Sequence, residues 1–463
     1  MEVIRTDYMN ISGLERYKMF YKFFDRACKL LAHRYNREVR NRNGLTVGDA
    51  LFNFIKLSFL ESTVLKYRNM VRFGDKVVLD STFPPYPSAA FDKRLSNYLN
   101  HFDLKDIPSG IVSISTTNLC PYSCAFCSTN SRRISKDDIE EELIIRTIKD
   151  IEDIGVPMII LHGGEPMYRF DRFLRIVKSV HRDTCLWMFT TGYGVSPERA
   201  RDLKENGLFG VWVSLDHFEP EIHNKLRGHP HAFENAQNAV KAFKEAGVYT
   251  CLSLVPPDDF IDPANFKKYY DMAYQMGVAE IRVMEKKPSG REASRGVNPH
   301  SPVLASLQRE LYEDPNYNDY PPLSGLSTWL EKDEALGCQC RFEYLFVSGS
   351  GDVQPCEVSE ISFGNIKEEP FPSIYSRISS CFEHCSTGCI PMVMYDEISQ
   401  YKSTKKKLTD LERLEISKSI IDGFRAKGDI PGAYKPLWNH YQQRLETYRR
   451  RKTTLCVDER RAQ

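Results

Sequence analysis

The sequence predicts an α/β protein whose centre is a partial, open (β/α)6 barrel. Between residues 110 and 290, six short apolar segments alternate with five segments of helical periodicity, and each helical segment is closed by a glycine or a proline. Strands that alternate with helices form a parallel sheet with the helices on its outer face. Six units are fewer than the eight of a complete barrel, so we expect the barrel to stay open.

The first 105 residues predict a separate domain that is helical and basic. Apolar residues recur every three or four positions between 14 and 42, which indicates an amphipathic helix. We expect a second helix from about 47 to 67, then a hairpin or strand and a proline-rich linker at 72–88. Residues 1–76 carry a net charge of +7.

The barrel is expected to occupy residues 106–300. Its strands are apolar runs bounded by turn residues, and its helices are the longer amphipathic segments between them. The strands are expected at 110–116, 157–166, 185–194, 210–217, 248–257 and 280–288, and the helices at 137–155, 169–183, 197–207, 232–247 and 263–277.

Two further parts are expected after the barrel. Residues 301–400 form a small cysteine-rich domain, which is too short to hold a large core and is expected to fold around metal. Residues 401–463 form a helical tail with a net charge of +8, while the chain from 77 to 400 carries −14. The basic ends suit an anionic partner such as an acidic peptide or a membrane surface, or they are simply solvated helix faces.

We expect the protein to be cytoplasmic. No apolar run approaches the length of a membrane span, and the N-terminus lacks the apolar core of a signal peptide. There are 13 cysteines, nine of them in two clusters. Clustered thiols in a reducing compartment are typical of metal ligands.

The first cluster is Cys120, Cys124 and Cys127, spaced C-x3-C-x2-C directly after the first barrel strand. This is the edge of the sheet at which α/β barrels place their chemistry. A structural zinc ion would require a fourth ligand, and the next cysteine, Cys185, is far along the chain. A [4Fe–4S] cluster held by three thiolates leaves one iron open to a substrate or cofactor.

With Phe126 before its third cysteine, this segment resembles the radical S-adenosylmethionine (SAM) superfamily. The resemblance extends over residues 110–291. It implies that the open iron binds SAM, that reductive cleavage of SAM gives a 5′-deoxyadenosyl radical, and that the radical abstracts a hydrogen atom from the substrate. The implied cofactor-binding residues are Gly163, Gly164, Glu165 and Pro166 of "HGGEP", Thr191 of "FTTGYG", Ser214 of "VSLDH", Arg227 of "LRGHPHAF", and Gly290 and Arg291 of "KPSGR".

The sequence departs from the family pattern at two positions. His217 stands where the family usually has glycine or alanine, and it either faces the substrate or has a hydrogen-bonded structural role. The third strand ends in TGYG instead of TNG.

The second cluster resembles the auxiliary iron–sulfur extension called SPASM, or its shorter twitch form. Residues 338–366 contain a cysteine, a strand, a Gly-containing hairpin, "PC" and "GNI". The resemblance implies one auxiliary [4Fe–4S] cluster, and a second would require a non-cysteine ligand or Cys456. A structural zinc site is the alternative. The implied ligands are Cys338, Cys340, Cys356, Cys381, Cys385 and Cys389.

The resemblance implies an enzyme that modifies a peptide or protein and receives electrons from a reductant such as ferredoxin or flavodoxin. One alternative is radical modification of a lipid or small molecule at a membrane surface, because the helix at 14–42 combines aromatic and basic residues. An alternative of another class is a non-catalytic iron–sulfur electron carrier, against which the GGEP motif argues. No clear nucleic-acid partner is indicated.

Overall fold

The computed structural model describes residues 8–11, 13–40, 70–100, 107–133, 138–257, 262–293, 306–307, 310–311, 314–324, 337–382, 386–404 and 408–429. The helix expected at 47–67, Cys385 and Cys456 lie outside the described residues. So do residues 405–407 and 430–463 of the helical tail that we expect at 401–463. The domain boundaries at 105, 300 and 400 stay predictions.

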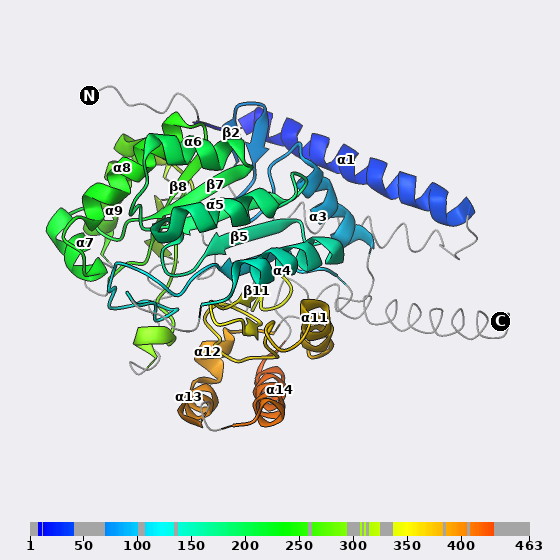
Figure 1. The fold of residues 1–463 in the computed structure, drawn as a ribbon. Coiled ribbons are helices and arrows are strands. Elements are labelled where there is room, and N and C mark those ends of the chain that lie inside the picture. Colours follow the sequence, from blue (N-terminus) through cyan, green and yellow to red (C-terminus); the bar gives the residue numbers. More distant parts are fainter. Residues whose placement is uncertain are drawn as a thin grey trace.

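The centre of the protein is a nine-stranded sheet with the order β10-β9-β8-β7-β6-β5-β4-β11-β12. The six expected strands are neighbours in this sheet and run parallel to one another, which confirms the predicted fold class (Figure 1). They are β4 (Ile111–Ser115), β5 (Met158–His162), β6 (Cys185–Thr190), β7 (Leu208–Ser214), β8 (Tyr249–Leu254) and β9 (Ile281–Val283).

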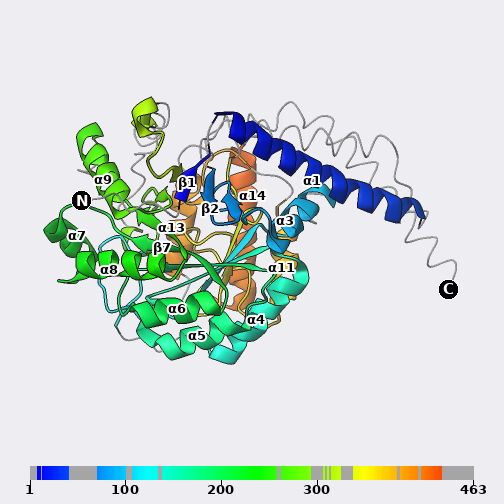
Figure 2. The same ribbon diagram turned by 90° about the horizontal axis from the view of Figure 1, so that it is seen from above.

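All five helices expected between these strands are present. They are α4 (Glu141–Ile154), α5 (Phe170–Ser179), α6 (Pro197–Glu205), α8 (Ala232–Glu245) and α9 (Pro263–Met276). Figure 2 shows them along an arc outside the sheet. The sequence analysis missed α7 (Pro220–Arg227), which starts at a proline and ends at Gly228 in the left-handed conformation. At eight residues, α7 is too short to show a clear apolar period.

The sheet extends beyond the six strands at both edges. β10 (Leu323–Ser324) pairs in parallel with β9. On the other side β11 (Tyr344–Val347) pairs in parallel with β4, and β12 (Val353–Gln354) pairs antiparallel with β11. The hairpin expected in the cysteine-rich segment is therefore present, and it also continues the barrel sheet.

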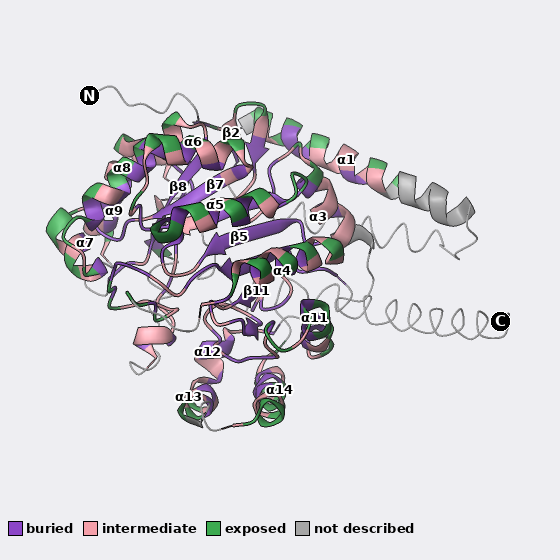
Figure 3. Cartoon of the chain, in the orientation of Figure 1, coloured by how far each residue is buried: buried purple, intermediate pink, exposed green. Residues whose placement is uncertain are grey.

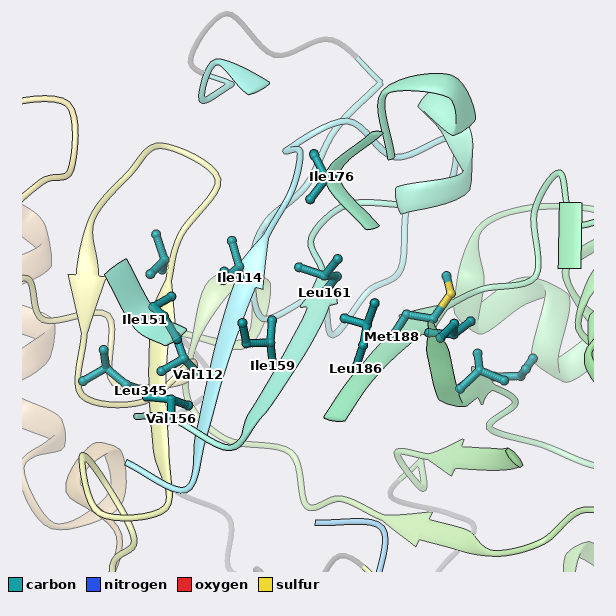
Figure 4. Packing of buried hydrophobic residues seen from close by; sticks show 14 of the residues in the cluster. Val112, Ile114, Ile151, Val156, Ile159, Leu161, Ile176, Leu186, Met188 and Leu345 are labelled. Atoms are coloured by element: carbon teal, nitrogen blue, oxygen red, sulfur yellow. The ribbon is translucent and has the colours of Figure 1, made fainter. Parts of the chain in front are cut away.

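The main core lies between the sheet and the outer helices. Figure 4 shows Val112 and Ile114 of β4 and Ile159 and Leu161 of β5 on one face of the sheet, packed in the same cluster as Ile151 of α4. The alternate residues of these strands point to the opposite face. Both faces are buried, as Figure 3 also shows, and this is typical of parallel sheets.

The N-terminal residues pack against the inner face of the barrel. β1 (Tyr8–Asn10), β2 (Val71–Phe73) and β3 (Lys76–Val78) form a three-stranded antiparallel sheet. The Tyr8 hydroxyl donates to the carbonyl of Val248 at 3.3 Å and accepts from the amide of Thr250 at 3.1 Å. The expected first helix is α1 (Gly13–Arg40), and α3 (Ala89–Asn100) packs against it (Figure 1).

Four helices follow the β11–β12 hairpin and lie together beyond that edge of the sheet (Figure 1). They are α11 (Phe371–Ser380), α12 (Ile390–Val393), α13 (Tyr395–Thr404) and α14 (Asp410–Lys427). Short helical turns also occur at η2 (Pro166–Arg169), η4 (Gly290–Glu292) and η5 (Pro315–Tyr317). Among the described helices, none is long and apolar enough to cross a bilayer.

Candidate functional site

The first cysteine cluster lies in a loop that leaves the C-terminal end of β4. Cys120 and Cys124 are buried and Cys127 is half-buried. The loop folds back on itself, because the amide of Cys120 donates to the carbonyl of Arg132 at 2.8 Å. Asp138 holds the beginning of the loop, because its carboxylate accepts a hydrogen bond from the amide of Asn118 at 2.6 Å. The three thiols are therefore presented by an ordered turn.

The two glycines of HGGEP fit against the backbone of this loop. The amide of Gly164 donates to the carbonyl of Thr117 at 2.6 Å. A Cβ on Gly164 would lie 1.9 Å from the carbonyl oxygen of Leu119, and one on Gly163 would lie 2.4 Å from that of Thr117. Gly163 also has a positive φ of 137°. Glycine is required here because the cysteine loop passes too close for a side chain.

Glu165 is wholly buried and accepts four hydrogen bonds. Its Oε1 accepts from the amide of Met167 at 3.0 Å and the hydroxyl of Thr190 at 2.8 Å. Its Oε2 accepts from the amide and hydroxyl of Thr191 at 2.7 and 2.6 Å. Burial raises the pKa of Glu165, and the bonds from Thr191 and Thr190 oppose that shift. These contacts use the acceptor capacity of the carboxylate, so Glu165 fixes the position of Thr191 at the end of β6.

Arg227 lies between Asp216 and Cys124. Its Nε donates to Asp216 Oδ2 at 2.5 Å, and its Nη1 is 3.8 Å from Cys124 Sγ. Burial by itself would lower the pKa of Arg227, but Asp216 and Cys124 outweigh it and raise the pKa. Burial raises the pKa of Cys124, and the neighbouring Arg227 lowers it. The arginine therefore favours the thiolate, which is the form of cysteine that binds metal.

Asp216 was missed as a site residue, although it lies inside the VSLDH segment. It is wholly buried, and its Oδ1 also accepts from the amide of Val255 at 3.0 Å. Its neighbour His217 is buried and accepts from the amide of Glu219 at 2.9 Å, which favours the hydrogen-bonded role of the two we considered. Ser214 ends β7 opposite Ser253 of β8.

The KPSGR turn closes the cysteine loop from the other side. Gly290 has a φ of 55°, and a Cβ on it would lie 2.1 Å from the carbonyl oxygen of Cys127. The amide of Arg291 donates to that same oxygen at 3.0 Å. The guanidinium of Arg291 donates to the carbonyl of Cys124 at 2.5 Å and to that of Ser131. Both residues thus hold the loop that carries the thiols, and Pro166 begins η2 beside it.

Three thiols of the second cluster lie together. The thiol of Cys340 is in hydrogen-bond contact with those of Cys338 and Cys356, and these contacts together with burial raise its pKa. Cys340 and Cys356 meet across the β11–β12 hairpin, as the sequence predicts. Cys381 ends α11, where its Sγ is 3.5 Å from the carbonyl oxygen of Arg377. Cys389 precedes α12.

Both thiol sets fit iron–sulfur clusters by their donor chemistry. Within the described ranges, no group of three His, Cys, Asp or Glu side chains converges as a site for a single metal ion. A [4Fe–4S] cluster takes each thiolate on a different iron, so its ligands surround it instead of meeting at one point. The positive charge of Arg227 beside Cys124 is consistent with an anionic sulfur ligand in the first set. In the second set, the contacts of Cys340 with Cys338 and Cys356 bring three sulfur donors together.

Comparison with known proteins identifies the class. Residues 114–266 match the Radical SAM superfamily, and residues 338–385 match the SPASM iron-sulfur cluster-binding domain. The protein is therefore a radical SAM enzyme with a SPASM domain, and its cofactors are SAM and [4Fe–4S] clusters.

Individual relatives are distant. The AdoMet-dependent heme synthase of Nitratidesulfovibrio vulgaris is 23% identical over 300 residues, which cover 58% of this chain and 78% of that protein. The sporulation killing factor maturation protein SkfB of Bacillus subtilis is 22% identical over 270 residues, covering 57% of this chain and 64% of that protein. Streptococcus suis SuiB, crystallised with its precursor peptide SuiA, has a similar fold, with a TM-score of 0.50 and 14% identity over 61% of this chain and 68% of that chain.

Proposed function

We propose that this enzyme takes a hydrogen atom from a peptide or protein and completes an oxidative modification of it. Two similar proteins support a peptide substrate by their names, a peptide maturation protein and an enzyme crystallised with its precursor peptide. Among the described residues, β10 and β12 are not paired with each other, so the barrel sheet does not close, which suits a long substrate. We further propose that the enzyme acts in the cytoplasm.

The observation that carries the proposal is the contact between the two segments that carry the cysteine clusters. Ser128, next to Cys127, donates to Glu357, next to Cys356, at 3.2 Å. The strand pairing of β11 with β4 joins the same two segments. The segments that carry the two sets of thiols are therefore bonded to each other, and this supports an enzyme that uses both sites on one substrate.

The cofactors supply the radical chemistry, and the protein holds them. When bound, SAM and its cluster would supply a 5′-deoxyadenosyl radical, and an auxiliary cluster would accept the electron that the substrate radical loses when its oxidation is completed. Cys120, Cys124 and Cys127 would hold the first cluster, and Cys338, Cys340 and Cys356 would contribute to the auxiliary one. Gly163, Gly164 and Arg291 keep the first loop in shape, and Thr191, Ser214 and Pro166 border the proposed SAM site.

A labelled substrate tests the proposal. Candidate peptides from short reading frames near the gene would be prepared with deuterium on their carbons and incubated anaerobically with the reconstituted, reduced enzyme and SAM. We expect deuterium in the 5′-deoxyadenosine and a peptide lighter by the hydrogens removed. An iron porphyrin precursor serves as the matched alternative, because one relative is a heme synthase. Deuterium transfer from the porphyrin and none from the peptide would replace the peptide proposal.

A second candidate function, at a membrane surface, is favoured by α1. Leu14, Tyr17 and Tyr21 are 72%, 66% and 72% exposed, and the neighbouring Lys18 and Lys22 are also exposed. Exposed aromatic and basic residues on one helix suit binding to anionic lipid. Sedimentation with vesicles that contain anionic lipid tests it. Equal binding by the wild type and a Tyr17→Ser, Tyr21→Ser variant would exclude this role for α1.

We also propose that an acidic one-electron reductant such as ferredoxin or flavodoxin docks beside the first cysteine loop. Arg132 and Arg133 are exposed on that loop, and Lys225 is exposed on α7. Attraction between such charges is screened by salt, so the reduction rate is expected to fall as the ionic strength rises and in an Arg132→Glu, Arg133→Glu variant. A rate that depends on neither would exclude this docking surface.

A further inference from the structure

The cysteine-rich segment touches the barrel side of the first site at two neighbouring points. Glu357 accepts from the hydroxyl of Ser128 at 3.2 Å. Three residues later, Glu360 accepts a hydrogen bond at Oε1 from the backbone amide of Gly290. Both glutamates belong to "CEVSE", which begins at Cys356. The segment that carries an auxiliary ligand is thus bonded directly to the KPSGR turn.

The contact of Glu360 with Gly290 can affect Cys124 and Cys127, because Gly290 packs against the loop that carries them. Its backbone is pressed against the cysteine loop, since a Cβ on it would lie 2.1 Å from the carbonyl oxygen of Cys127. The amide of the next residue, Arg291, donates to that oxygen, and its guanidinium donates to the carbonyl of Cys124. A displacement of Gly290 must therefore displace the loop between Cys124 and Cys127.

Glu360 is itself held firmly. Its Oε2 is 2.7 Å from Lys402 Nζ on α13, and the two side chains are only 23% and 19% exposed. Water screens this pair less than a fully exposed one. Glu360 also has a φ of 50°, a conformation that residues other than glycine rarely adopt and that persists only where the surroundings hold it. From the same helix, the hydroxyl of Tyr395 donates to the carbonyl of Ala293 at 3.0 Å.

We propose that Glu360 is a positioning residue through which residues 337–404 set the shape of the first cysteine loop. Lys402 and the left-handed backbone fix the carboxylate, the carboxylate fixes Gly290, and Gly290 with Arg291 fixes the loop. SAM affinity then depends on a residue that lies in the cysteine-rich segment and not in the barrel. The inference does not depend on the identity of the substrate.

The test compares Glu360→Ala with Glu360→Gln in the full-length, anaerobically reconstituted enzyme. Glu368→Ala is the matched control, because Glu368 is an exposed glutamate of the same segment. Hydrogen–deuterium exchange over residues 120–133 reports the loop directly, and equilibrium dialysis reports SAM affinity. We expect faster exchange and about tenfold weaker SAM binding in Glu360→Ala, the size of one hydrogen bond to a charged group.

Glu360→Gln retains an acceptor for Gly290 and is expected to restore most of the loop protection. Wild-type exchange and SAM affinity in Glu360→Ala, or a glutamine variant as impaired as the alanine variant, would overturn the proposal. If Glu360→Ala does not fold, Lys402→Met leaves Glu360 in place and removes only its partner. We expect this variant to shift both readouts in the same direction by a smaller amount, and no shift would overturn the proposal.

Discussion

The buried pair of Asp216 and Arg227 is expected to be essential to the barrel end that carries the cysteines. The two side chains are 0% and 9% exposed and 2.5 Å apart. Removing one member of a buried ion pair leaves an uncompensated charge and costs about 3–5 kcal/mol. We therefore expect Asp216→Asn and Arg227→Met each to lower the free energy of unfolding by that amount. Arg227→Met also removes the charge beside Cys124, so its iron content is expected to fall.

Anaerobic denaturation followed by tryptophan fluorescence measures this loss. Trp187 and Trp212 are buried in the barrel with their rings 4.2 Å apart, so their emission reports on the barrel. Arg201→Met is the matched control, because Arg201 pairs with Glu198 at the exposed surface. We expect no measurable change in the control. Losses below about 1 kcal/mol in both variants, or strict additivity in the double variant, would refute the reasoning.

Three further predictions follow from the site. Cys340→Ala with Cys356→Ala is expected to lower iron per chain while SAM-dependent signals of the first cluster persist; unchanged iron would exclude these ligands. Gly164→Ala places a Cβ 1.9 Å from a loop carbonyl and is expected to lower the melting temperature and iron content, whereas Gly74→Ala, which meets nothing within 4 Å, leaves iron content unchanged. Burial lowers the pKa of His223 from 6.5 to about 4. Between these two pKa values the unfolded chain binds more protons than the folded one. The free energy of unfolding is therefore expected to fall by roughly 3 kcal/mol as the pH drops from 6.5 to about 4. His223→Gln is expected to make the free energy of unfolding depend less on pH in this range. An unchanged pH dependence would contradict the prediction.

The local sequence pattern was sufficient to predict most strands and helices of the barrel. The apolar runs of β4 to β9 and the longer amphipathic helices are set by neighbours within a few residues, so their periodicity can be read directly. The spacing of Cys120, Cys124 and Cys127 likewise indicates a three-thiolate site, because a short loop keeps such residues close. The sequence analysis named Gly163 and Gly164 as cofactor-binding residues. In the structure the backbone of the cysteine loop is the group that lies closest to both glycines.

The rest depended on contacts between residues far apart in the chain. Pairing of β11 with β4 brings together segments more than 200 residues apart, and no local pattern encodes that register. Glu360 and Lys402 look like ordinary surface charges in the sequence. In the structure Glu360 accepts a hydrogen bond from Gly290 and pairs with Lys402. Asp216 could have been found from VSLDH, since a buried arginine needs a carboxylate partner.

The most direct test of the account is the formation of 5′-deoxyadenosine from SAM by the reconstituted, reduced enzyme under anaerobic conditions. We predict product from the wild type and from a Cys340→Ala variant, and none from a variant in which Cys120, Cys124 and Cys127 are all alanine. Product from that triple variant, or none from a wild type with its iron in place, would contradict the assignment of these three thiols to the SAM-binding cluster.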